Sequence, residues 1–135
     1  MAPPRTYRCE SIILSYTPLD EADLLVTMYT RDRGKVRAIG KGARRATSKL
    51  MGHLEPLTVV QMSMANGRSM DIISQAEVIQ SFSQLKGDLD GISKGLYLAE
   101  LVDGFGAEDS PNPNLYQLMI DTLTVLQADT ESDMS

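Results

Sequence analysis

Several residue types that carry common kinds of chemistry are scarce in this sequence of 135 residues. It has one cysteine, Cys9, one histidine, His53, and no tryptophan. A lone cysteine cannot form an intrachain disulfide, and a structural zinc site takes four ligands. The lone histidine has no nucleophile or carboxylate partner that spacing identifies. We therefore expect Cys9 to be an inert strand residue and His53 to be structural, and we predict no enzyme activity, no cofactor and no metal.

Long apolar runs are also missing. No stretch has the length that a membrane-spanning helix needs, and the first residues, MAPPRTYRCE, lack the apolar segment of a secretory signal. With 42% hydrophobic residues, the chain has enough apolar side chains for one compact domain, or for a small domain with an added helical element. The composition predicts a soluble, cytoplasmic protein.

Positive charge is scarce overall but concentrated in one place. The formal net charge is -5, yet residues 1–70 carry +5 and residues 71–135 carry -10. Between residues 31 and 49, eight basic side chains stand beside a single acid, Asp32. A run of charge is often only a solvated face, so the cluster needs support from its structural context.

The sequence pattern of residues 1–80, the first part of the chain, predicts a β-barrel. Five runs have strand composition, and Asn66-Gly67 between the last two is a strong hairpin signal. RDRG predicts a second hairpin in which Gly34 takes a positive φ. Five short strands with a small, partly helical insertion after the third match a Greek-key barrel of the OB type. The five runs are TYRCESIILSY, LLVTMYT, KVRAIGKG, LTVVQMSMA and SMDIISQAEVI.

The second part, residues 81–135, has helical periodicity. One first helix is predicted from about residue 82 to near Phe105, and a second is predicted to begin near Leu115 with Asn112 or Asn114 as its cap. Two helices alone bury little, so they must pack on the barrel, on a third helix or on another chain. We expect a partial helical domain with a disordered acidic tail, ADTESDMS. Asp20, Glu21 and Asp23 in the first part are interpreted as a polar turn before the second strand.

The basic cluster lies within residues 20–60, DEADLLVTMYTRDRGKVRAIGKGARRATSKLMGHLEPLTVV. This stretch resembles the bacterial RecO family of recombination mediators. The similarity starts near YRCESIILSY, is strongest at GKVRAIGKGARR and GHLEPLTVV, and continues to YLAELVD in the helical part. It implies an OB-fold amino-terminal domain followed by a helical domain, with no catalytic activity.

The resemblance also implies partners. RecO proteins bind single- and double-stranded DNA, anneal complementary strands, engage the acidic tail of single-stranded DNA-binding protein, and work with RecR to load RecA, in the cytoplasm near the nucleoid. Family members typically continue well beyond this length, many with a cysteine-rich zinc element. We therefore expect an incomplete helical domain here, from a truncated product or a fragment, and no zinc.

Matching the family's basic block onto this sequence gives candidate nucleic-acid contacts. Lysine and arginine can follow a phosphate backbone and release its counterions. Lys35 and Arg37 are two residues apart on one predicted strand and therefore share a face, while Gly40 and Gly42 leave the backbone near Lys41 unobstructed. The primary candidates are Lys35, Arg37, Lys41, Arg44, Arg45 and Lys49, and the secondary ones are Arg31, Arg33 and Arg68.

Aromatic rings for base stacking are few. Tyr7, Tyr16 and Tyr29 are the only rings in the predicted barrel, and tyrosines in strands more often belong to the core or the strand surface than to a stacking platform. Binding through phosphates leaves base faces free to pair, which is compatible with strand annealing.

Two other functions remain open. The chain could be an RNA-binding OB module, because charge and fold do not separate the two polymers. It could also be a protein-interaction adaptor whose helical hairpin offers a groove to a partner peptide, although such apolar stripes are usually core. The apolar residues in question are Leu96, Leu101, Val102 and Phe105.

Overall fold

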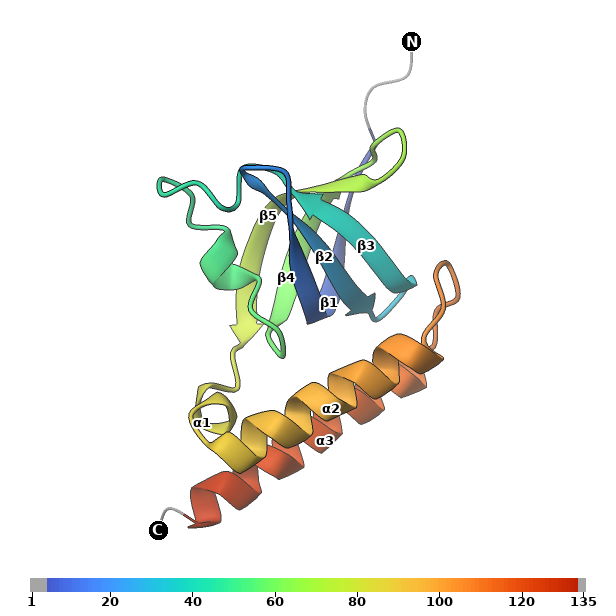
Figure 1. Ribbon diagram of the computed structural model, residues 1–135. Coiled ribbons are helices and arrows are strands. Elements are labelled where there is room, and N and C mark those ends of the chain that lie inside the picture. Colours follow the sequence, from blue (N-terminus) through green and yellow to red (C-terminus); the bar gives the residue numbers. More distant parts are fainter. Residues whose placement is uncertain (1–4, 134–135) are drawn as a thin grey trace.

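The structure, a computed structural model, describes residues 5–133, without the side chains of residues 131–133. Five strands close into a barrel in the order β1-β2-β3-β5-β4, and three α-helices lie together at one end of it (Figure 1). The predicted OB-type barrel followed by helices is confirmed. The strands are β1 (Thr6–Leu19), β2 (Asp23–Thr30), β3 (Gly34–Gly40), β4 (Val59–Ala65) and β5 (Asp71–Gln80); the helices are α1 (Ser83–Lys86), α2 (Leu89–Phe105) and α3 (Pro113–Asp133).

The barrel is built around its long first strand. The first half of β1 pairs with β4 and the second half pairs with β2, with a register shift between Ile13 and Ser15 that helps the strand to bend. β3 pairs with β2 along its whole length, but it meets β5 in parallel only over Ala38–Gly40. This short parallel contact completes the closure and is the topology that the Greek-key prediction requires.

The turns follow the sequence signals closely. Gly34, after the turn between β2 and β3, has φ +74°, as predicted for the last residue of RDRG. The helical turn predicted in the insertion is a 3-10 helix at Met51–His53. The hairpin at Asn66-Gly67 is also present, although its loop spans residues 66–70 and is longer than the dipeptide signal suggests.

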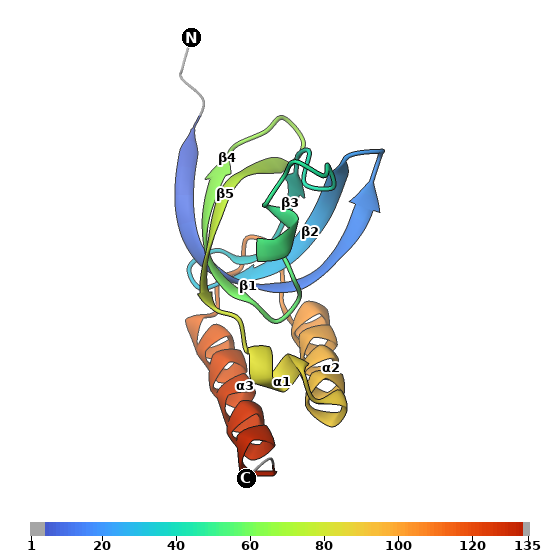
Figure 2. The same cartoon turned by 90° about the vertical axis from the view of Figure 1, so that its left-hand side faces the viewer.

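Two groups of buried residues hold the molecule together. One fills the inside of the barrel, and the other lies between the barrel and the helices, which pass under its end as a hairpin (Figure 2). The helices thus pack both on the barrel and on the short helix α1, which contributes Leu85. The second group contains Ile12, Leu14, Tyr29, Leu57, Val59, Phe82, Leu85, Ala99, Val102, Tyr116, Met119 and Leu123.

The helix boundaries have local causes. The prediction of one continuous first helix from about residue 82 is wrong, because Asp88 accepts a hydrogen bond from the backbone N–H of Gly91 and caps α2, which separates it from the short α1. Asn112 accepts from the N–H of Leu115 at 3.1 Å, so it is the cap of α3, with Pro113 as the first helical residue. A Cβ at Gly95 would lie 2.7 Å from Cδ1 of Leu57, so a glycine in mid-helix allows α2 to approach the barrel closely.

The predicted disorder of residues 128–135 is wrong for residues 128–133, because α3 continues to Asp133. Thr130 is buried, and its hydroxyl lies 3.1 Å from where a Cβ of Gly91 would be. Packing of this last part of α3 against the start of α2 stabilises a helix that acidic composition alone disfavours. The remaining residues, 134–135, lie outside the described part of the chain. Among residues 5–133, no helix is long and apolar enough to cross a membrane.

Candidate nucleic-acid interface

Three connections lie at the end of the barrel that faces away from the helices (Figure 1). They are the β1–β2 turn at residues 20–22, the first part of the β3–β4 connection at residues 41–49, and the β4–β5 loop at residues 66–70. We call them together the free end of the barrel. In OB folds, the β2–β3 face and the β1–β2 and β4–β5 loops are the usual surface for oligonucleotides.

The β3–β4 connection is fastened to the β1–β2 turn at its base. The N–H of Gly42 donates to Oδ1 of Asp23 at 2.7 Å. Arg44 donates from its backbone N–H to the carbonyl oxygen of Ala22 at 2.8 Å, and from its guanidinium to that of Asp20 at 2.7 Å. Asp20 and Glu21 lie in a polar turn before the second strand, as interpreted from the sequence, whereas Asp23 is already the first residue of β2. The basic connection therefore has a fixed base.

Five of the predicted contact residues at the free end are exposed cations, and one of them, Arg44, is the residue that donates to the carbonyl oxygen of Asp20. Among the described residues, the other four have no such bond to the β1–β2 turn. Lys41, Arg45 and Lys49 project from the β3–β4 connection and Arg68 from the β4–β5 loop. Within the described part of the chain, none of the four forms an ion pair. Lys41 and Lys49 line one hollow of the surface together with residues of β5. The free end thus presents positive charge that no carboxylate in residues 5–130 neutralises.

The two predicted contacts on β3 are in a different situation. Lys35 donates from Nζ to both the carbonyl oxygen and Oδ1 of Asp103 in α2, at 3.0 Å each, and only 15% of its side chain is exposed. Nε of Arg37 lies 3.7 Å from Oε1 of Glu108, in the connection between α2 and α3. The two cations lie on one side of the strand, as their spacing predicts, but carboxylates of the helical part already contact both.

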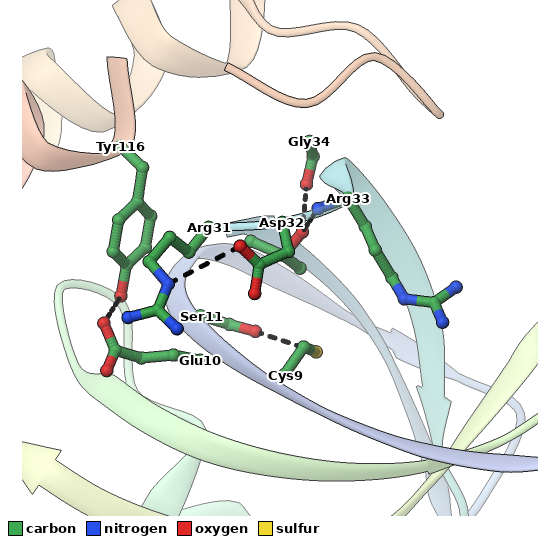
Figure 3. A network of polar contacts seen from close by, with 9 residues as sticks. Cys9, Glu10, Ser11, Arg31, Asp32, Arg33, Gly34 and Tyr116 are labelled. Carbon is green, nitrogen blue, oxygen red and sulfur yellow. Dashed lines mark hydrogen bonds and ion pairs between the residues drawn. The ribbon is translucent and has the colours of Figure 1, made fainter. Parts of the chain in front are cut away.

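The secondary candidates Arg31 and Arg33 lie at the β2–β3 turn, which is at the helix-facing end of the barrel (Figure 1). Figure 3 shows Arg31 beside Asp32, with Nε 3.6 Å from Oδ1. The guanidinium of Arg33 lies 3.7 Å from the centre of the Tyr7 ring, a cation–π contact. Hence the nine candidates do not form one continuous cluster: Arg31 lies at the helix-facing end, whereas Arg33 lines a hollow beside β3 together with Ser69 and Met70 of the β4–β5 loop.

A polar network beside this turn joins α3 to β1 (Figure 3). The hydroxyl of Tyr116 donates to Oε2 of Glu10 at 2.7 Å, and the N–H of Arg31 donates to the carbonyl oxygen of Glu10. Burial, and then the hydrogen bond to Glu10, raise the pKa of Tyr116 above its ordinary value. Tyr116 therefore stays a neutral donor, which fixes α3 against the barrel.

The tyrosines of the barrel are packed or occupied, as the sequence predicts. Tyr29 is fully buried, and Tyr7 and Tyr16 pack against the barrel core. Tyr7 also donates from its hydroxyl to Asp71. Among these three rings, none is an exposed platform for a base, so the free end offers charge and not stacking.

The lone histidine and the lone cysteine both make structural contacts. Nδ1 of His53 donates to the carbonyl oxygen of Ala76 in β5 at 2.9 Å. Cys9 is buried in β1 beside Ser11, and burial raises the pKa of its thiol. In the described part of the chain, no cluster of histidine, cysteine or carboxylates could hold a metal ion.

Sequence reasoning missed the carboxylates that contact β3. Asp103 is 68 residues from Lys35, and Glu108 is further along the chain than Asp103. The only signal of them in the sequence was the acidic excess of residues 71–135. Such a signal indicates an attraction between the two parts of the chain but not which residues meet.

Comparisons with known proteins agree with the fold. The family model described as recombination protein O N terminal matches residues 1–82, and that described as recombination protein O C terminal matches residues 86–135. The boundary between the two matches falls where the barrel ends and the helices begin.

Curated relatives carry the name DNA repair protein RecO. One from Desulforamulus reducens is 35% identical over 90% of this chain and 48% of its own length. One from Dehalococcoides mccartyi is 34% identical over 99% of the chain and 53% of its own length. One from a Nocardioides species is 41% identical over 90% of the chain and 51% of its own length. The chain thus spans about half the length of these relatives.

Proposed function

The chain belongs to the family of recombination protein O, and from this premise we propose that its barrel binds DNA in repair and recombination. The observation that carries the proposal is a group of exposed cations at the free end that form no ion pair within the described residues, namely Lys41, Arg45, Lys49 and Arg68. They project from two loops at the end of an OB barrel where oligonucleotides commonly bind.

The candidate residues should not contribute equally. A cation without a carboxylate partner can bind a phosphate directly. A cation in an ion pair must first give up that pair, which weakens its net contribution to binding. Arg44 is partly engaged, because it donates to the carbonyl oxygen of Asp20, and Lys35 is held by Asp103. With about four phosphate contacts, the logarithm of the affinity for a single strand should fall with the logarithm of salt concentration with a slope of about -3.

Phosphate contacts without aromatic stacking suit strand annealing, because the bases of a bound strand stay free to pair. We extend the proposal to that activity, and to the partners that family membership suggests: RecR, the acidic tail of single-stranded DNA-binding protein and, indirectly, RecA. Residues 1–80 would then act as the DNA-binding domain and residues 81–135 as part of a helical domain, in the bacterial cytoplasm.

A protein-interaction adaptor is the second candidate function. Of the four apolar residues named for it, Val102 is buried between helix and barrel, but Leu96, Leu101 and Phe105 are 40%, 38% and 78% exposed. Leu101 and Phe105, four residues apart, share one face of α2, whereas Leu96 lies on another, and this exposed apolar pair is an observation in favour of a protein partner. RNA binding would use the same cations as DNA, and competition between DNA and RNA oligomers separates these two polymers.

The test is fluorescence anisotropy of a labelled single strand titrated with the protein over a series of salt concentrations. A variant with Arg45→Gln and Lys49→Gln should lose about two phosphate contacts, which flattens the slope by about 1.4. The matched control carries Arg8→Gln and Lys94→Gln, which remove the same charge from β1 and α2. Equal loss in both variants, or no binding by the unmodified protein at low salt, contradicts the proposal.

A further inference from the structure

The connection between α2 and α3 lies against the helix-facing end of β3. The N–H of Lys35 donates to the carbonyl oxygen of Ala107 at 3.1 Å. The backbone of Glu108 also pairs with that of Gly34 and Lys35 in isolated β-bridges. β5 pairs with β3 only over Ala38–Gly40, so in the first half of β3 the connection takes the place of a neighbouring strand. We call the end of α2 and the start of this connection, residues 103–109, together the acidic connection; its acids are Asp103, Glu108 and Asp109.

The contact is built into the fold at Gly34. This residue has φ +74°, and a Cβ on it would lie 2.6 Å from the carbonyl oxygen of Ser110 and 2.8 Å from that of Ala107. Any side chain at this position would push the connection away from β3. The close approach, and with it the position of Glu108, therefore depends on a glycine in the β2–β3 hairpin.

The two ion pairs that the acidic connection makes with β3 differ in accessibility. Lys35 is largely buried and bound to two oxygens of Asp103, so it acts as a structural anchor. Arg37 and Glu108 are 49% and 60% exposed, and their closest charged atoms are 3.7 Å apart. An exposed pair at this distance is weak, and a phosphate can replace the carboxylate.

We propose that Glu108 competes with phosphate for Arg37, so that the acidic connection limits nucleic acid to the free end of the barrel. A strand that extends along β3 must displace Glu108 before Arg37 can bind it. This inference rests on the proposed function. It identifies Arg37 as the exchangeable contact of the site and Glu108 as the residue that sets how far the bound strand reaches.

Removal of the competing charge should strengthen binding in a defined way. Glu108→Gln frees Arg37 for one additional phosphate, which steepens the salt slope for a single strand by about 0.7. The affinity at low salt should rise by up to about fivefold, the range of an exposed ion pair. Glu100→Gln is the matched control, because Glu100 is an exposed acid of α2 that forms no ion pair within the described residues.

The experiment compares five proteins by anisotropy over a salt series: the unmodified chain, Glu108→Gln, Glu100→Gln, Arg37→Gln and the double variant Arg37→Gln with Glu108→Gln. The inference predicts a gain in Glu108→Gln that exceeds the gain in Glu100→Gln and disappears when Arg37 is also replaced. Thermal unfolding of each variant verifies that the fold is intact.

Two outcomes overturn the inference alone: an equal gain in the two single acid variants, which means that only net charge matters, or a gain that persists without Arg37. In both cases the unmodified chain still binds, so the proposed function stands. Absence of binding by all five proteins at the lowest salt overturns the proposed function and this inference with it.

Discussion

At the scale of single residues, two separate constraints require a glycine after the β2–β3 turn. Gly34 takes a positive φ, and the backbone of the α2–α3 connection occupies the space where a side chain would be. Gly42 offers a comparison, because its φ is also positive, +69°, yet the nearest atoms to its added Cβ belong to the flexible Arg45 side chain at 3.7 Å.

We expect Gly34→Ala to lower the free energy of unfolding by about 3 kcal/mol or more, since strain in φ adds to a backbone clash. Gly42→Ala should cost only about 1 kcal/mol, from the strain alone. Urea unfolding of the two variants measures the difference. Equal costs would show that the connection moves aside without loss, and that its contact with β3 is not rigid.

At the scale of secondary structure elements, the attachment of α3 to β1 depends on a neutral tyrosine. The folded-state pKa of Tyr116 is raised above the ordinary value of 10.0. Above pH 10, the hydroxyl of Tyr116 therefore keeps its proton in the folded protein, whereas the unfolded chain releases it. This group stabilises the fold fully below pH 10, and the contribution is lost as pH rises through the folded-state pKa.

Tyr116→Phe should therefore lower stability at pH 7 by about 1 to 2 kcal/mol, the value of a hydrogen bond to a charged acceptor. Above pH 10 the difference between the variant and the unmodified chain should shrink. Urea unfolding at pH 7 and pH 10.5 provides the measurement. A difference that stays constant over this range would contradict a raised pKa for Tyr116.

The elements also show what sequence could and could not predict. All five strands, both hairpins, the helical turn before Pro56 and the cap at Asn112 follow from signals within a few residues, so they were predictable. The helical conformation of residues 128–133 at the end of α3 could not be predicted in this way, because its stability comes from burial of Thr130 against α2. Composition describes a segment in isolation, and packing overrides it.

The candidate site divides in the same way. That Lys35 and Arg37 share a face could be predicted from their spacing along one strand, but the concentration of basic residues in the sequence did not predict that the candidates divide between separate surfaces. That the two cations on β3 form ion pairs could not be predicted, since their partners Asp103 and Glu108 belong to the helical part of the chain. Only the three-dimensional arrangement separates the cations at the free end from those on β3.

At the scale of the whole molecule, barrel and helices share a core. Ile12, Tyr29 and Leu57 of the barrel side are fully buried within the group of residues that contacts the helices. Each such side chain contributes roughly 1.5 to 3 kcal/mol when it leaves water. The barrel therefore depends on the helices for its stability, although the two parts differ in architecture and charge.

A chain restricted to residues 1–82 should accordingly be less stable than the full chain by at least about 3 kcal/mol, because it exposes that surface to water. Urea unfolding followed by circular dichroism compares the two proteins, and binding of an apolar dye reports the exposed surface. Equal midpoints and no extra dye binding would mean that the barrel folds independently of the helices.

The short parallel contact of β3 with β5 has a consequence for how the barrel assembles. β3 and β5 join over three residue pairs, across a chain separation of 33 residues between Ala38 and Asp71, whereas β1 and β4 join over seven pairs. Closing a long loop costs conformational entropy, and three residue pairs form few contacts to offset that cost. Because it has so few pairs, we expect this seam to form late during folding and to open before the other strand pairs, next to the strand that carries Arg37.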